Sequence, residues 1–160
     1  GQDIKDGVIW SSLMSSPNSP DPRPDQGNRE WTLSVYPHRG DWRAAGTPRR
    51  GYELNEPLIA VAEPSHAGKL PAAKSYVSVS APNIIVTALK KAEDNDGLIL
   101  RLYETDGQPC KTTISTALPV RSFVECDLME RTIGQKQGII GGKFSVTVGK
   151  CEIKTYKLIQ

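Results

Sequence analysis

Residues 82–107 read PNIIVTALKKAEDNDGLILRLYETDG, and this stretch predicts a β-hairpin. Its first half is apolar and β-branched from Ile84 onward, its second half places apolar side chains at alternate positions, and the polar turn at residues 93–97 ends in glycine. These are the signals of two antiparallel strands joined by a short connection. In the second strand three leucines share one face, which we predict to be the core face: Leu98, Leu100 and Leu102.

The composition of the 160 residues is that of a globular, soluble protein, with 38% hydrophobic and 24% charged residues. A net charge of +2 is too small to indicate a nucleic-acid partner. No apolar run approaches the ~20 residues that a membrane helix needs, so we expect no membrane partner. The three cysteines match no zinc spacing, which favours free thiols and a cytoplasmic location: Cys110, Cys126 and Cys151.

The segment before the hairpin predicts mixed structure. Residues 8–10 and 13–14 suggest a first strand, and the proline-rich residues 15–27 predict a loop because proline removes backbone donors. Residues 29–36 alternate apolar and polar side chains, which predicts a half-buried strand. Residues 48–54 predict a short helix with proline in its first turn.

The segment that includes the hairpin predicts about seven short strands separated by turn signals, which is typical of an antiparallel β-sandwich. Besides the hairpin, the predicted strands are residues 74–80, 112–117, 120–128, 143–148 and 153–159. Residues 63–73 are rich in small residues, proline and glycine and predict a linker. We therefore predict a mainly β chain with two parts, residues 1–68 and 69–160, the first holding the last strands and a short helix of a larger β-domain.

One candidate site is the turn that follows residue 36. His38 and Asp41 could serve acid–base chemistry or bind a metal, but a structural hydrogen bond in a turn explains the same pair, and His66 is the only other histidine. A zinc site needs three or four converging ligands, so we expect no metal in this chain. Residues 39–41 also spell the adhesion tripeptide Arg-Gly-Asp, which the cytoplasmic expectation argues against.

Two other segments resemble ligand-binding motifs but lack residues that those motifs need. Residues 94–97 resemble the start of a calcium loop, but Thr105 stands where that loop needs glutamate. Residues 138–143 resemble a phosphate loop with too few residues between the glycines, and Phe144 follows the lysine. No evident catalytic centre is present, because the chain has no nucleophile elbow and its sequence places no pair of carboxylates face to face.

The order of short motifs along the chain resembles the C-terminal half of the glycoside hydrolase family 38 α-mannosidases, closest to their cytosolic and bacterial branch. The motifs that carry this resemblance are SLMSSP at 12–17, SPDP at 19–22, DQG at 25–27, YPH at 36–38, GDW at 40–42, YELN at 52–55, PL at 57–58, LILRLYE at 98–104, LPV at 118–120, CDLME at 126–130 and EIKT at 152–155. Two positions depart from the family pattern, since Ser15 stands where arginine is usual and Arg29 where histidine is usual.

The resemblance implies that this chain is the non-catalytic C-terminal part of a larger enzyme, here called the parent enzyme. The parent would be a retaining, zinc-dependent α-mannosidase whose nucleophile, acid–base carboxylate and zinc lie in an N-terminal barrel, with mannose-containing glycans as substrates. This chain would brace the barrel and hold no cofactor. Loops near the barrel would supply candidates for the pocket wall: Asp21, Asp25, His38, Asp41 and Trp42.

The sequence is also compatible with other functions. A free-standing carbohydrate-binding sandwich would use exposed aromatic rings, for which the candidates are Trp10, Trp31, Tyr36 and Trp42. A purely structural or adhesion sandwich is a third alternative, and a homo-oligomer is a further partner to consider. The opening residues contain no methionine, and we expect a piece of a longer polypeptide.

Overall fold

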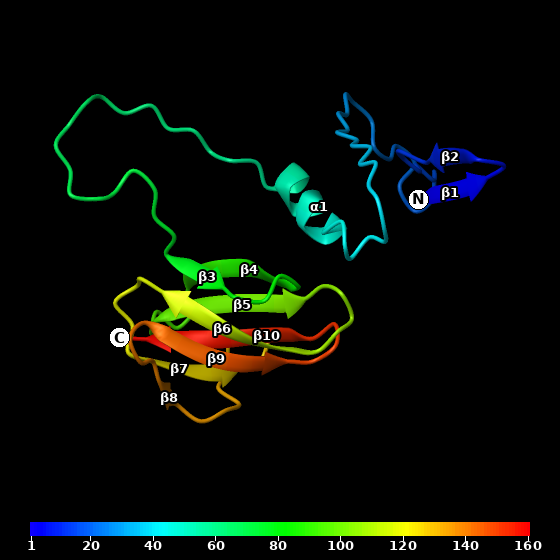
Figure 1. Ribbon diagram of the computed structural model, residues 1–160. Coiled ribbons are helices and arrows are strands. Elements are labelled where there is room, and N and C mark those ends of the chain that lie inside the picture. Colours follow the sequence, from blue (N-terminus) through cyan, green and yellow to red (C-terminus); the bar gives the residue numbers. More distant parts are fainter. The chain divides into compact units, whose positions relative to one another are not determined.

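The computed structural model describes residues 1–160 (Figure 1). The chain divides into two compact units, Gly1–His38 and Arg39–Gln160, and each is described by itself. The predicted boundary between residues 68 and 69 stays a prediction. No helix in the structure has the length and apolar character needed to cross a membrane.

The first unit contains one antiparallel hairpin, formed by β1 (Gln2–Lys5) and β2 (Val8–Ser11). The turn residues Asp6 and Gly7 have φ angles of 51° and 74°, the left-handed conformation that a two-residue hairpin turn requires. The strand predicted at residues 8–10 is thus confirmed, whereas residues 13–14 lie outside it. The loop predicted for residues 15–27 is also confirmed, because no helix or strand is present there.

The prediction of a half-buried strand at residues 29–36 was wrong. These residues form neither helix nor strand, and the three apolar side chains expected on the buried face are 47%, 65% and 88% exposed: Trp31, Leu33 and Val35. An alternating pattern predicts which side chains share a face, but a strand also needs a neighbour that accepts its backbone hydrogen bonds.

The second unit begins with a turn that leads into α1 (Thr47–Asn55), which confirms the predicted helix. Pro48 lies in the first turn, where its missing N–H is not needed. Arg49 extends from α1 and donates from Nη2 to the backbone oxygens of Pro82 and Ile84, at 3.2 and 3.3 Å. These bonds connect the helix to the entry of the hairpin strand.

The rest of the second unit is an antiparallel β-sandwich, which confirms the predicted fold class (Figure 1). One sheet has the strand order β4-β5-β10-β7-β8 and the other has the order β3-β6-β9. The strands are β3 (Val77–Val79), β4 (Ile84–Lys91), β5 (Leu98–Glu104), β6 (Cys110–Thr116), β7 (Ser122–Cys126), β8 (Gln137–Gly138), β9 (Lys143–Val148) and β10 (Ile153–Ile159). The predicted hairpin is the pair β4–β5.

The core lies between the two sheets. Leu100 and Leu102 of β5 are fully buried there and Leu98 packs against the same cluster, so the predicted core face is confirmed. Three aromatic rings fill the centre, with Phe123 and Phe144 stacked at 4.1 Å and Tyr156 edge-on to both. Offset stacked and edge-to-face pairs are the favoured arrangements of aromatic rings.

One carboxylate is buried at the end of β5. Glu104 is 1% exposed and accepts hydrogen bonds from Asn83 Nδ2 and from the backbone N–H groups of Asp106, Gly107 and Cys151, at 2.7 to 2.9 Å. Asn83 precedes β4, Asp106 and Gly107 follow β5, and Cys151 lies between β9 and β10. The Glu104 side chain therefore joins three connections of the sandwich.

Candidate functional site

The candidates in the proline-rich loop form local contacts within the first unit. Asp21 Oδ1 accepts a hydrogen bond from the backbone N–H of Arg23 at 2.9 Å. Asp25 accepts one from Ser16 Oγ at 3.2 Å and lies 3.9 Å from the Arg29 guanidinium. Both carboxylates are exposed, and the structure does not bring them together with another titratable group that would form a catalytic pair.

His38 ends the first unit, and its ring lies 5.5 Å from the ring of Tyr36. Its side chain is exposed. No group of three or more His, Cys, Asp or Glu side chains in residues 1–160 is arranged to hold a metal ion. The residues of this chain therefore do not form a site for the zinc that the resemblance implies, and the expectation that this zinc belongs to the barrel of a parent enzyme stays a prediction.

Asp41 and Trp42 belong to the second unit and are held by their own turn. Asp41 Oδ1 accepts hydrogen bonds from the N–H groups of Arg43 and Ala44, at 3.1 and 2.9 Å. The Ala44 bond is the main reason that the pKa of Asp41 is lowered. The Arg43 guanidinium lies 4.3 Å from the centre of the Trp42 ring, and its Nε donates to Asp106 O at 2.7 Å. The arrangement positions Arg43 between this turn and the sandwich.

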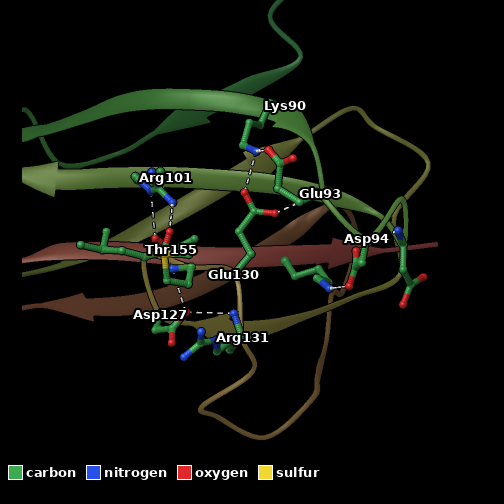
Figure 2. A network of polar contacts seen from close by, with 12 residues as sticks. Lys90, Glu93, Asp94, Arg101, Asp127, Glu130, Arg131 and Thr155 are labelled. Carbon is green, nitrogen blue, oxygen red and sulfur yellow. Dashed lines mark hydrogen bonds and ion pairs between the residues drawn. The ribbon is translucent and has the colours of Figure 1, made fainter.

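A denser polar network, which the sequence did not point to, surrounds the loop that follows β7 (Figure 2). We call residues 127–131 the network loop. Arg101 of β5 lies directly opposite Thr155 of β10, so its Nε reaches Thr155 Oγ1 at 3.1 Å. The same guanidinium donates from Nη2 to Leu128 O at 2.9 Å. The loop is thus hydrogen-bonded to side chains that the sheet positions.

The network loop also holds its own conformation. Asp127 Oδ1 accepts from the N–H groups of Met129 and Arg131, at 2.8 and 2.9 Å, and two backbone bonds join Asp127 to Glu130 and Arg131. Glu130 takes the left-handed conformation, with φ of 65°. Aspartate directly after a strand commonly forms such a turn through its side chain. Asp127 was the one sequence signal that could have indicated this loop.

Glu130 ties the network loop to the β4–β5 turn. One of its carboxylate oxygens lies 2.6 Å from Lys90 Nζ and the other accepts from the N–H of Glu93 at 2.8 Å. Lys90 also forms an ion pair with the Glu93 carboxylate. The Lys90 ammonium is the main cause of the lowered pKa of Glu130, and the Glu93 N–H contributes. Glu130 therefore stays ionised and acts as an anchor.

A second ion pair closes the same turn. Lys157 of β10 is 7% exposed, and its ammonium binds the carboxylate of Asp94 in the β4–β5 turn. This pairing raises the pKa of Lys157 and lowers that of Asp94. The four carboxylates of this network all bind an ammonium or backbone N–H groups: Glu93, Asp94, Asp127 and Glu130. Because these carboxylates are bound within the fold, their arrangement is suited to fixing the network loop and the β4–β5 turn rather than to acid–base catalysis.

Apolar side chains lie at the tip of this anchored loop. Leu128 is 58% exposed and Met129 is 70% exposed. Leu128 also lines a shallow pocket of about 330 Å³ whose other walls come from α1 and the strands: Tyr52, Thr87, Arg101, Tyr103 and Ile153. The rings of Tyr52 and Tyr103 lie 6.3 Å apart. Burial, together with a hydrogen bond to Tyr52, raises the pKa of Tyr103 to about 12.

Replacing Glu130 with glutamine should loosen the network loop without unfolding the sandwich. Glutamine cannot form the ion pair with Lys90, and we expect the Glu93 amide proton to exchange about tenfold faster with solvent. Hydrogen exchange with mass or NMR readout measures this. Glu53→Gln, an exposed carboxylate on α1 paired with Arg50, is the matched control and should leave the exchange unchanged. Equal exchange in both variants would contradict the anchoring role.

Comparison with known proteins identifies the sandwich. Residues 83–156 match the family described as "Glycosyl hydrolases family 38 C-terminal beta sandwich domain". The sandwich of this chain therefore belongs to the C-terminal β-sandwich region of this family, which confirms the resemblance inferred from the motifs.

Curated relatives extend the match beyond the sandwich. Alpha-mannosidase 2C1 of Homo sapiens is 36% identical over 135 residues, which is 82% of this chain and 13% of that protein. The Mus musculus protein of the same name is 35% identical over 134 residues, again 82% of this chain and 13% of the relative. Alpha-mannosidase G of Dictyostelium discoideum is 32% identical over 157 residues, 96% of this chain and 14% of the relative. The chain thus spans about one-seventh of the length of these relatives.

Proposed function

We propose that this chain is the non-catalytic C-terminal part of a retaining, zinc-dependent α-mannosidase of the cytoplasm, an enzyme that hydrolyses terminal α-mannosides of glycans. In this proposal the partner of the chain is the rest of the parent enzyme, and the chain braces the catalytic barrel. Zinc and the catalytic carboxylates belong to that barrel.

The observation that carries the proposal is the extent of the match to alpha-mannosidase G. It covers 96% of this chain and therefore includes most of residues 1–82 as well as the sandwich. A free-standing module that shared only the sandwich with the mannosidases would not be expected to resemble one over residues 1–82 as well. The relatives named above are all alpha-mannosidases.

The polar geometry supports a bracing role. The buried Glu104 and the carboxylates of the network bind backbone N–H groups and cations within the fold. These carboxylates are therefore engaged in holding the structure and are not positioned to exchange a proton with a substrate. The exposed candidates remain proposals as parts of a pocket wall that the barrel would complete: Asp21, Asp25, His38, Asp41 and Trp42.

We expect the isolated chain to release no nitrophenol from 4-nitrophenyl α-mannoside, with or without added zinc. Retaining glycosidases need a pair of facing carboxylates, which the proposal assigns to the barrel, so the product of the full gene should hydrolyse the same substrate. The assay is absorbance over time at equal molar protein. Turnover that tracks with the 160-residue polypeptide through purification would overturn the proposal.

Calorimetric titration of the isolated chain with mannose and mannobiose tests the carbohydrate-binding alternative. The proposal predicts no binding at millimolar sugar. Saturable binding that is lost in Trp31→Ala or Trp42→Ala would favour the alternative, because sugars stack on exposed aromatic rings and both side chains are exposed.

A further inference from the structure

The network loop combines rigid anchoring with an apolar tip. Arg101, Asp127 and Glu130 fix its backbone, while Leu128 and Met129 project from it with more than half of their surface exposed. Single exposed apolar residues are common on protein surfaces, whereas neighbouring ones that form a contiguous patch indicate a contact surface. A loop held in one conformation binds a partner without a further loss of chain entropy.

The apolar surface continues beyond the loop. Leu128 shares a pocket with Tyr103 and Ile153 of the five-stranded sheet and with Tyr52 of α1. We call these residues with Met129 the apolar patch. Contiguous exposed apolar residues beside tyrosine and arginine side chains are typical of protein interfaces. The pocket beside Leu128 gives the surface a concave part that could receive a side chain of a partner.

We propose that the apolar patch docks the sandwich onto the remainder of the parent enzyme. This inference rests on the proposed function. The occupant follows from the length of the relatives, in which the match to this chain is only 13% or 14% of the polypeptide, so that the remainder offers a large surface on the same chain. A covalently linked partner is present at high effective concentration, and a small patch is then sufficient for docking.

Methionine oxidation gives a direct test, because the chain has only two methionines and Met129 is 70% exposed. Dilute hydrogen peroxide should convert Met129 to the sulfoxide readily in the isolated chain. In the full gene product we expect at least a tenfold slower conversion, read by peptide mass. An equal rate in both proteins would overturn the inference, while the mannosidase assay would still decide the proposed function separately.

A charge at the tip tests docking by a second route. Met129→Glu should leave the melting temperature of the isolated chain within about two degrees, because an exposed substitution changes stability little. In the full gene product it should speed proteolytic cleavage within residues 63–73, which are exposed and form neither helix nor strand, relative to the unsubstituted protein. Ile140→Glu, at an 84% exposed position away from the patch, is the matched control and should not. Cleavage that responds equally to both variants would contradict the inference.

A second copy of this chain is the other occupant that the experiment can detect. In that case Met129 of the isolated chain would become protected as the protein concentration rises, with a matching increase in mass in solution. That result would overturn docking to the parent enzyme and assign the patch to self-association.

Discussion

Leu100→Asp should lower the free energy of unfolding of the sandwich by roughly 4 kcal/mol or more. Leu100 is completely buried in the core. In the strand register it lies between Leu89 of β4 and Tyr156 of β10. The substitution removes a buried aliphatic side chain and introduces a carboxylate without a partner, which together cost roughly 4 kcal/mol or more. A typical domain has a free energy of unfolding of about 5–15 kcal/mol, so the substitution would remove a large share of it.

The measurement is urea unfolding of both proteins, followed by circular dichroism. Leu89→Asp is the matched control, because Leu89 lies opposite Leu100 in the same hairpin but is 42% exposed. Its carboxylate can reach water, and we expect a much smaller loss of stability. If Leu100→Asp unfolds at the same urea concentration as Leu89→Asp, the assignment of the core face is wrong.

The hairpin could be predicted because its signals are local. The alternation of the leucines at 98, 100 and 102 reports a buried face directly, and the glycine that ends the turn is required by the structure. Gly97 has φ of 97°, and a Cβ atom there would lie 2.3 Å from the backbone oxygen of Leu158. Both constraints are visible in sequence as a glycine after polar turn residues.

The features that the sequence did not predict depend on contacts between residues far apart in the chain, which a local pattern does not report. Residues 29–36 carry a strand pattern without a neighbouring strand, so their apolar side chains stay exposed. Glu104 and Glu130 look like ordinary surface residues in the sequence, and only the folded connections bring backbone N–H groups to them. The strand predicted at residues 120–128 overlaps the network loop, because the sequence has no glycine or proline between the end of β7 at Cys126 and Asp127.

The second large effect is expected at Glu104. Its two carboxylate oxygens accept four hydrogen bonds, and in Glu104→Gln one of these oxygens becomes an amide that donates. Two buried donors would then face another donor, at a cost of about 1–3 kcal/mol each. We expect Glu104→Gln to lower the free energy of unfolding by roughly 2–4 kcal/mol at pH 7. Glu125→Gln, which removes only a partly exposed ion pair with Lys154, should cost less than about 1 kcal/mol.

The effect of Glu104→Gln should depend on pH in a direction that the hydrogen bonds determine. Burial raises the pKa of Glu104, but the N–H groups of Cys151 and Asp106 and the amide of Asn83 outweigh burial and lower it from an ordinary value of 4.5 to about 2. A carboxyl whose pKa is lower in the folded state stabilises the fold fully above its unfolded pKa, and this stabilisation disappears as the pH falls toward the folded value. The two pKa values correspond to about 3 kcal/mol at neutral pH.

Urea unfolding at pH 7, 4.5 and 3 should therefore show the stability difference between wild type and Glu104→Gln shrinking as the pH is lowered. Other carboxylates also titrate in this range, but they are shared by both proteins and cancel in the difference. A difference that stays constant from pH 7 to pH 3 would mean that the unfolded and folded states bind the Glu104 proton equally. The buried carboxylate would then stabilise the three connections through packing alone, and its charge would contribute nothing.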